Sequence, residues 1–428
     1  MVKLDRHPST IPKVLAVLPG FIPSTQITIV TPLLDLCALR AVDFRLHLEG
    51  TVKAKDVNWA DIVILCRNVE PGQAWFSYML QQQKPYIYDI DDNFFDIPGD
   101  SPVARYHRSP ERLKMLTEYL RYASLVRVYS APLYSRVLPI NSKVVKVVPP
   151  LDFRHVRPRR AVGDTVKIVY ATSRADDELF SIFLPALQKI LKNYGPKIGV
   201  YFLGFTPPAL RKHPHVHTAP MIWNYPAFLR NFSSAGYDIG LAPLLDDVFH
   251  RSKTNNKFRE YGACQIAGVY SNVDVYASCV RQDETGILVS NKTNDWYDAL
   301  ALLIENPHLR QKIQSAAHEF VRNNYSQEEF VKNWAGQIKD VLETQKLNNY
   351  ILPVMQVDNL KNTNKPGLIK RIHDKFSQSN DWMSFLSLIN HIIRQRVSSL
   401  LLLWKYKVII MYASFNHSVH RKISSWIR

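Results

Sequence analysis

The segment 252–261 (SKTNNKFREY) places a lysine, hydroxyl groups and a carboxylate within ten consecutive residues. It follows a strand-like run at 237–244 after a short loop, and its composition predicts a helix that opens with its first residues. Free backbone N–H groups at a helix start, with Lys253 and Thr254, suit a phosphate. Glu260 lies about two turns further on, where a carboxylate can accept hydrogen bonds from a ribose. The pattern therefore predicts a site for a sugar nucleotide.

A second group of carboxylates lies in the segment 88–98 (YDIDDNFFDIP), at the end of a predicted strand. Asp89 and Asp91 spell Asp-x-Asp, and two carboxylates at this spacing can share a hard divalent cation. Aspartates also cap and turn the ends of strands without any ligand. The residues alone leave both alternatives open.

The composition is that of a globular protein with room for two domains and an extension. The chain has 428 residues, of which 46% are hydrophobic and 21% are charged. Its net charge of +17 is uneven, because residues 346–428 hold 13 basic and three acidic side chains. Such a tail favours an anionic surface, either lipid or nucleic acid. No RNA-binding motif accompanies the charge, so we do not expect nucleic acid as a partner.

The start of the chain and the cysteines favour a cytoplasmic location. The apolar run at 14–18 is closed by Pro19-Gly20 and is too short for the hydrophobic region of a signal peptide. The four cysteines show neither a metal-binding spacing nor a disulfide framework, which is typical of buried thiols in a reducing compartment. We expect the basic tail to add peripheral contact with the inner face of a membrane.

Apolar runs alternate with helical patterns along most of the chain, and the alternation restarts once. Strands are expected at 13–18, 44–48, 61–66, 85–89, 125–129 and 144–148, then at 166–170, 198–203, 238–241, 266–270 and 286–289. This order predicts an α/β protein with two Rossmann-like, doubly wound domains, at 1–155 and 156–344. Such domains bind ligands at the carboxyl ends of their strands, so the two should face a common cleft.

The remainder of the chain differs in character. Residues 345–370 are polar, include two prolines and are expected to form a linker. Residues 371–428 predict a basic, amphipathic helical extension, but no charge-free run reaches the roughly 18 residues of a spanning helix. We favour a helix lying in an anionic membrane interface. The alternative is a helical pair that packs on the protein itself or on a partner.

Several segments together resemble GT-B glycosyltransferases, in the family-4-like branch that uses nucleotide sugars. The resemblance covers residues 10–344, and its local patterns occur in the family's order. They are YDIDDNFFDIP at 88–98, LVRVYSAPLYSRV at 125–137, KVVKVVPPLD at 143–152, the segment 237–263, and TGILVS at 285–290. The resemblance implies a GT-B fold with an acceptor-side domain followed by a nucleotide-sugar-binding domain.

The resemblance also implies roles for residues of the second domain. Lys253 with Thr254 would hold the donor diphosphate, and Glu260 matches the glutamate that binds the nucleotide ribose. Gly204 ends the strand beside the base pocket. His250, just before this segment, is expected to line the donor site together with its neighbours.

Further positions follow from the same likeness. Ser173 and Arg174 lie in the loop where the family contacts phosphate. Asp91 and Asp92 lie where related enzymes face the donor sugar or the acceptor, and Asp91 and Asp92 with Lys253 are the candidate catalytic residues. GT-B enzymes use cationic side chains and helix N-termini in place of a metal, so no metal is expected here.

The chain departs from the family at one position that contacts the sugar. Many members carry two glutamates eight positions apart, but the residue eight before Glu260 is Ser252. Ser252 would still belong to the donor site, while the identity of the sugar is left open. The expected activity is a retaining, metal-independent hexosyl transfer from a nucleotide-diphosphate sugar to a glycan or lipid-linked hydroxyl, in surface polysaccharide or glycoconjugate synthesis. No cofactor is expected beyond the donor. The alternatives are a non-catalytic scaffold that docks a partner enzyme at the membrane, or a sugar-nucleotide epimerase.

Overall fold

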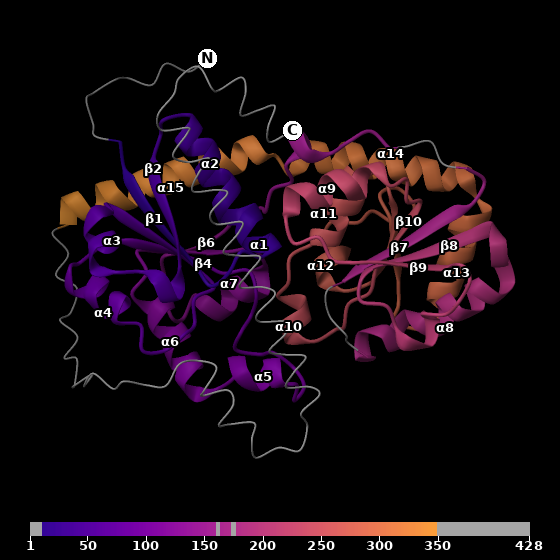
Figure 1. The fold of residues 1–428 in the computed structure, drawn as a ribbon, viewed down its shortest axis with the longest axis horizontal. Helices are drawn as coiled ribbons and strands as arrows, with labels where there is room; N and C mark the ends of the chain where they lie inside the picture. Colours follow the sequence, from indigo (N-terminus) through magenta and orange to yellow (C-terminus); the bar gives the residue numbers. More distant parts are fainter. Residues whose placement is uncertain (1–10, 160–162, 173–176, 349–428) are drawn as a thin grey trace.

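The computed structural model describes residues 11–159, 163–172 and 177–348, which form two parallel sheets (Figure 1). The first sheet has the order β2-β1-β3-β4-β5-β6. Its strands are β1 (Lys13–Leu18), β2 (Asp43–Leu48), β3 (Ile62–Cys66), β4 (Tyr86–Asp89), β5 (Leu125–Val128) and β6 (Val144–Lys146). The second sheet has the order β12-β11-β10-β7-β8-β9. Its strands are β7 (Val166–Thr172), β8 (Ile198–Gly204), β9 (Val216–Ala219), β10 (Ile239–Ala242), β11 (Ala267–Ser271) and β12 (Ile287–Val289).

Helices connect the strands in both domains, as parallel pairing requires. The first domain contains α1 (Pro23–Thr25), the π-helix η1 (Gln26–Val30), α2 (Thr31–Ala38), η2 (Glu49–Thr51), α3 (Ala54–Trp59), α4 (Ala74–Gln81), α5 (Pro102–His107), α6 (Pro110–Arg121) and α7 (Ala131–Val137). The second contains α8 (Asp177–Tyr194), η4 (Gly195–Lys197), η5 (Pro208–Leu210), α9 (Tyr225–Ser234), α10 (Val248–Arg251), α11 (Asn256–Ala263), α12 (Asp274–Ala277), α13 (Thr293–Glu305) and α14 (Pro307–Asn324). The short helix η3 (Phe153–His155) lies in the connection between the domains, and α15 (Gln327–Asn348) ends the described chain. The predicted α/β class with two doubly wound domains is confirmed.

The strands form where the sequence offers apolar residues to both faces of a sheet. Every residue of β3 (IVILC) and of β11 (AGVYS) is buried, because helices cover both sides of these central strands. Edge strand β9 (VHTA) is different, since none of its four residues is fully buried. This polar strand was absent from the strands expected from the sequence.

The strand orders place the crevice of each domain. In the second sheet β7 lies between β8 and β10, so the connections leave in opposite directions from β7 and β10. In the first sheet the same reversal falls between β1 and β3. Ligands of open α/β sheets bind outside the carboxyl ends of the strands at such switch points. The loops that follow β1, β3, β7 and β10 are therefore the expected walls of a site.

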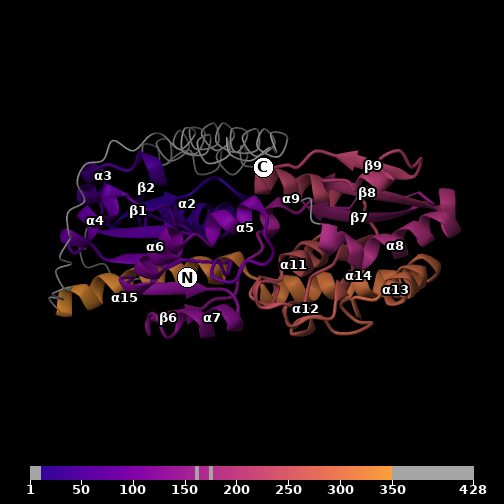
Figure 2. The same cartoon turned by 90° about the horizontal axis from the view of Figure 1, so that it is seen from below.

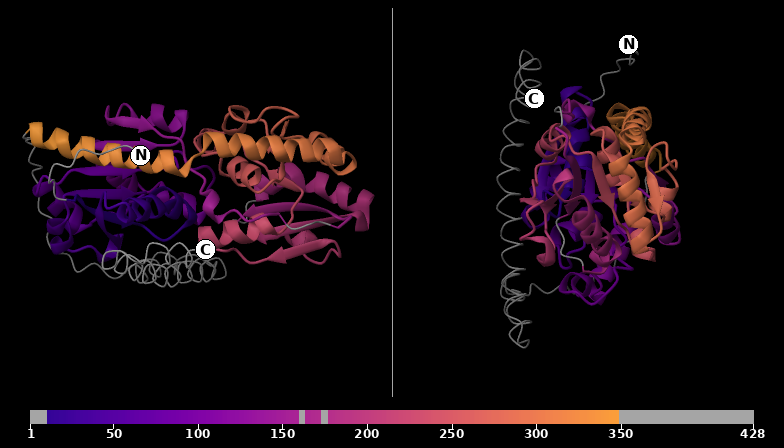
Figure 3. Two further views of the ribbon diagram at one scale, coloured as in Figure 1. Left: turned by 90° about the horizontal axis from the view of Figure 1, so that it is seen from above. Right: turned by 90° about the vertical axis from the view of Figure 1, so that its right-hand side faces the viewer.

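Helix α15 returns to the first domain after the second is complete. Its Phe330, Trp334 and Ile338 are buried in the same apolar cluster as β1 and β2. Figure 3 shows α14 and α15 following one another along one face of the molecule, and Figure 2 shows α15 beside the first sheet. The sequence-based division had assigned residues up to 344 to the second domain. Packing assigns α15 to the first domain instead.

The chain passes between the domains twice, at neighbouring points. The first passage follows β6 and contains the predicted boundary at 155/156, and the second lies between α14 and α15. Leu151 N–H donates to the carbonyl of Tyr325 at 2.9 Å, which joins the two passages. The two connections therefore run side by side.

Part of the predicted tail lies within α15 and the rest is not described. Helix α15 continues to Asn348, so the expected linker at 345–370 does not begin at its first residue. Residues 349–370 and the predicted extension at 371–428 lie outside the described residues. Within the described part of the chain, no helix combines the length and apolar composition needed to cross a membrane.

Candidate functional site

An ion pair joins the two domains at the carboxyl ends of their strands. Asp92 follows β4 in the first domain, and its Oδ1 lies 3.2 Å from Nζ of Lys253 in the second. The expected helix does not start at Ser252. Helix α10 ends at Arg251, α11 begins at Asn256, and Lys253 lies in the turn between them. Lys253 and Glu260 are thus on separate elements, so the single helix expected to carry both is not observed.

Arg67 holds both candidate aspartates from within the first domain. Its Nη1 donates to Asp91 Oδ2 at 3.1 Å, and its Nη2 donates to Asp92 Oδ2 at 2.7 Å. The same guanidinium donates to Ser24 Oγ at 2.9 Å. The segments that follow β1, β3 and β4 therefore meet at one arginine.

Burial and charge act against each other in this cluster. Burial tends to lower the pKa of Arg67, but the charges of Asp91 and Asp92 outweigh it and raise that pKa. Burial raises the pKa of Asp91, which Arg67 counteracts and the charge of Asp92 reinforces. Two carboxylates share this space only because cations face them from both domains.

Asp89 lies behind this cluster and is fully buried. Its Oδ2 accepts a hydrogen bond from Arg127 Nε at 3.1 Å and from the hydroxyl of Tyr129 at 2.5 Å. Burial raises the pKa of Asp89 to about 6, even though the charge of Arg127 lowers it. Asp89 is therefore a structural carboxylate, which separates its role from those of Asp91 and Asp92.

Glu260 lies on α11 and is only 6% exposed. Its Oε2 accepts a hydrogen bond from Lys257 Nζ at 2.8 Å, one turn earlier on the same helix. Arg259 is also buried, and it donates to the carbonyl of Pro150 and to Asn256 Oδ1. The first turns of α11 thus carry two more cations than the sequence hypothesis had used.

Ser252 is fully buried and its polar groups are occupied. Its hydroxyl donates to the carbonyl of Val248 at 2.7 Å and lies 3.3 Å from the amide nitrogen of Asn93, across the domain boundary. Its carbonyl accepts a hydrogen bond from Ser130 Oγ at 2.7 Å. This residue, which the sequence predicts to belong to the donor site, connects the two domains in the structure.

Three of the other predicted residues, His250, Thr254 and Gly204, belong to the described part of the second domain. The ring of buried His250 lies with Nδ1 2.6 Å from Asp247 Oδ2, and Thr254 Oγ1 donates to Asn256 Oδ1 at 2.9 Å. Gly204 ends β8 with a positive φ of 101° and pairs in register with Thr172, the last residue of β7. Ser173 and Arg174 follow Thr172 and lie outside the described residues.

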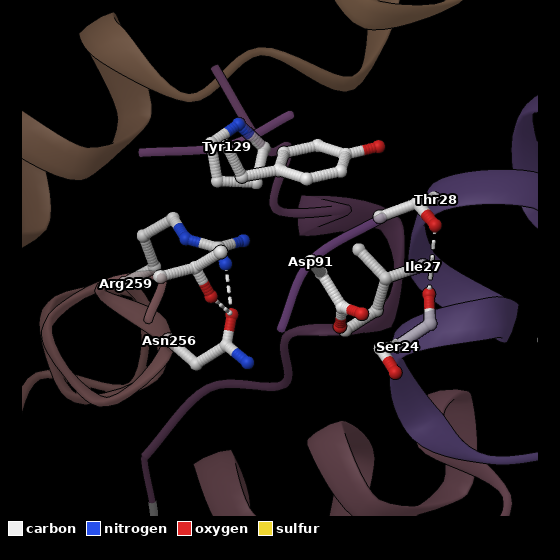
Figure 4. Close-up of a pocket in the computed structure, with 9 residues that line it drawn as sticks. Ser24, Ile27, Thr28, Asp91, Tyr129, Asn256 and Arg259 are labelled. Atoms are coloured by element: carbon white, nitrogen blue, oxygen red, sulfur yellow. Dashed lines mark hydrogen bonds between the residues drawn. The ribbon is translucent and has the colours of Figure 1, made fainter. Parts of the chain in front are cut away.

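A small cavity lies between the domains, beside this cluster. Figure 4 shows Ser24, Thr28 and Asp91 of the first domain on one side and Asn256 and Arg259 of the second on the other. Its volume is only about 10 Å³, roughly the space of one water molecule. Small-molecule sites occupy roughly 300–1,000 Å³, so this space is too small for a nucleotide in the present arrangement of the domains.

Gln26 of the π-helix η1 also joins the two domains. Its Nε2 donates to the carbonyl of Trp223 at 2.7 Å, and its Oε1 accepts from the backbone N–H of Tyr225 at 2.9 Å. Both ends of one buried amide thus contact the second domain. No pattern in the sequence indicated that Gln26 would contact the second domain. Arg67, in contrast, comes directly after the apolar run 61–66, and this position at a strand end could have marked it as a site residue.

The described residues contain no group of three or more histidines, cysteines, aspartates or glutamates placed to hold a metal ion. Anionic ligands of this site would meet cationic side chains and backbone N–H groups. Three cationic side chains of the second domain lie at or near the boundary: Lys253 pairs with Asp92, Lys257 pairs with Glu260, and Arg259 lines the cavity.

No protein-family model and no curated protein matches the chain. Solved structures resemble it at low sequence identity. HepE from Anabaena, in complex with UDP and glucose, is 11% identical with a TM-score of 0.56, covering 77% of this chain and 100% of that chain. Sucrose-phosphate synthase from Thermosynechococcus elongatus is 12% identical with a TM-score of 0.57, covering 78% and 100%. A putative UDP-N-acetylglucosamine 2-epimerase from Listeria monocytogenes is 12% identical with a TM-score of 0.51, covering 78% and 98%. These likenesses show that the chain has the GT-B fold.

Proposed function

We propose that this chain transfers a sugar from a nucleotide-diphosphate donor to a hydroxyl of a glycan or lipid-linked acceptor. The observation that supports it most is the ion pair between Lys253 and Asp92, which lies beyond the carboxyl ends of the strands of two facing sheets. A cation on one domain and two carboxylates on the other suit a donor diphosphate and an acceptor. The fold shared with HepE, whose structure contains UDP and glucose, supports the same donor class.

The chemistry follows from where charge develops. As the glycosidic bond to the donor breaks, negative charge accumulates on the leaving diphosphate. A cation fixed beside it stabilises that charge without solvent reorganisation. Lys253 would supply this stabilisation, and Glu260 would accept hydrogen bonds from the nucleotide ribose. Closure of the domains would exclude water and limit hydrolysis of the donor.

The second reactant would approach from the first domain. Asp91 and Asp92 follow β4 and face the boundary, where their oxygens can accept hydrogen bonds from sugar hydroxyls. Lys253, Lys257 and Arg259 would take the place that a divalent metal has in other sugar transferases. We therefore propose a metal-independent hexosyl transfer in glycan or surface polysaccharide synthesis.

The test begins with the donor. A thermal-shift screen of UDP-, GDP-, ADP-, CDP- and TDP-sugars identifies the class that raises the melting temperature, because a ligand bound only by the native state stabilises it. Incubation of that donor with candidate acceptors, with and without EDTA, should then give a glycosylated product and free nucleoside diphosphate. Lys253→Ala should abolish the shift. The matched control Lys292→Ala, at an exposed residue before α13, should keep it.

One observation favours the scaffold alternative. Ser252 stands where many family-4 enzymes have a sugar-contacting glutamate, and it is buried in interdomain contacts. A scaffold would show no shift with any donor and no Lys253 dependence. An epimerase would convert the donor's sugar without an acceptor. Analysis of the sugar released by acid after incubation with donor alone distinguishes it from a transferase.

A further inference from the structure

Asp92 uses its two carboxylate oxygens in opposite directions. Oδ2 accepts from Arg67 Nη2 at 2.7 Å within the first domain, and Oδ1 lies 3.2 Å from Lys253 Nζ across the boundary. The three side chains are largely buried, with exposed fractions of 13% for Asp92, 13% for Arg67 and 20% for Lys253. In such surroundings a charge pair is stronger than on an open surface.

Arg67 is held in an unusual backbone conformation at the point where it acts. Its φ of +58° lies in the left-handed region, which is unfavourable for a residue other than glycine. This backbone comes directly after β3 and brings the guanidinium to Ser24, Asp91 and Asp92 at once. The side chain also lies 5.1 Å from the ring of Phe94. Strained residues held by several partners occur most often at functional sites.

Lys253 therefore already has a negative partner at the position where a diphosphate would bind. A donor diphosphate that reaches Lys253 meets the carboxylate of Asp92 as a like charge. It must take over the contact with the ammonium group, while Asp92 keeps its second contact, to Arg67. After transfer, Asp92 is in place to compete with the diphosphate product for Lys253.

Resting on the proposed function, we infer that Asp92 is a displaceable counter-ion of Lys253 and that Arg67 is the positioning residue that retains it. The pair holds the domains together without donor, and exchange of Asp92 for a diphosphate couples binding to domain movement. Arg67 has a second effect, because it neutralises Asp91 and Asp92 and so limits their repulsion of the diphosphate.

The test measures the affinity of UDP, GDP, ADP, CDP and TDP by titration calorimetry for wild type and variants. For the nucleoside diphosphate that wild type binds, Asp92→Asn should bind about tenfold more tightly, because a competing charge is gone. Arg67→Met should bind about tenfold more weakly, because two carboxylates lose their neutralising cation. Arg67→Lys should recover part of this loss. In the Asp92→Asn background, Arg67→Met should reduce the affinity for the nucleoside diphosphate by a smaller factor than it does in wild type.

The opposite signs separate the inference from a purely structural role, which would weaken binding in every variant. Thermal melts check that each variant is folded. If Arg67→Met does not fold, Asp92→Asn and Arg67→Lys still decide the outcome. If wild type binds a nucleoside diphosphate and folded Asp92→Asn binds it no more tightly, the inference is overturned and the proposed function stands. If wild type binds none of the five, the proposed function fails and takes the inference with it.

Discussion

The guanidinium of Arg127 lies 3.7 Å from the ring centroid of Trp334, so a residue of β5 and one of the last described helix are stacked. Arg127 also donates to Asn333 Oδ1 at 3.2 Å and to Gln337 on the same helix. Trp334 Nε1 donates to the carbonyl of Thr28 at 2.8 Å. Helix α15 thus packs on the first domain through Arg127, which also binds Asp89, and through Thr28 of η1.

Replacing the stacked tryptophan should destabilise the first domain. Trp334 is fully buried, and Trp334→Ala removes its packing and leaves the carbonyl of Thr28 without this donor. Large-to-small changes of this kind cost about 3–5 kcal/mol. The expected result is a lower melting temperature, measured by circular dichroism. Lys339→Ala, at a 71% exposed side chain on the same helix, is the control and should melt like wild type. Equal melting of the two variants would contradict the proposed role of α15.

The amide of Gln26 should hold the domains in their present contact. Gln26→Ala leaves the N–H of Tyr225 and the carbonyl of Trp223 without this partner, and an unsatisfied buried group costs about 1–3 kcal/mol. We expect a larger radius of gyration in small-angle X-ray scattering, because the domains separate more readily. Gln82→Ala, at an exposed residue after α4, should leave the radius unchanged. A compact Gln26→Ala protein would show that other contacts suffice.

Glu49 offers a prediction about pH. It is buried in the first domain beside Tyr119, whose hydroxyl lies 3.4 Å from its Oε1. Burial, and next the charge of Glu70, raise its pKa from 4.5 to about 8. Between these two values the folded chain binds one proton more than the unfolded chain. Raising the pH through this window therefore removes stability, and the full contribution is present only below the lower value.

Glu49→Gln should abolish that dependence, because the neutral amide has no proton to lose. Chemical denaturation from pH 5 to pH 9 should show the variant gaining on wild type by up to about 1.4 kcal/mol per pH unit. The gain should level off above about pH 8. Glu284→Gln, at a 48% exposed side chain, should follow wild type throughout. Parallel curves for Glu49→Gln and wild type would show that the buried carboxyl titrates normally.

Glu260 should bind the ribose of the nucleotide and Lys253 its diphosphate. Glu260→Gln should weaken binding of the recognised nucleoside diphosphate about tenfold, because an amide accepts ribose hydrogen bonds less strongly than a carboxylate. It should not weaken binding of inorganic pyrophosphate, which has no ribose. Lys253→Ala should weaken both ligands. Competition titrations measure the two affinities. Equal losses of both ligands in Glu260→Gln would assign Glu260 to the diphosphate or to the fold.

The fold was largely predictable because most of its strands are short runs of mainly apolar residues. Short apolar runs such as 61–66 and 166–170 predict strands covered on both faces, and β3 and β7 form at these positions. Strand β9 was missed because its threonine and histidine are exposed at the sheet edge. The return of α15 was missed for another reason. An amphipathic pattern predicts a helix with one buried face, but not which sheet that face covers.

The candidate site was predictable in part for similar reasons. The sequence placed Lys253 and the aspartates at strand ends, and topology brings them together. It did not separate α10 from α11. Asp247 caps α10 by accepting the N–H of His250 at 2.9 Å, and the polar residues that follow favour a turn over a continuous helix. The contacts of Arg67 with Ser24, Asp91 and Asp92 join segments that follow three different strands, and no local spacing in the sequence encodes them.

The paired passages of the chain at Leu151 and Tyr325 limit how the protein can open. A single tether would let one half swivel freely against the other. Two adjacent connections joined by a hydrogen bond favour a hinge rotation about one axis and oppose a twist of one domain against the other. In the proposed movement of the domains, Lys253 and Asp92 would therefore separate and return along nearly the same path.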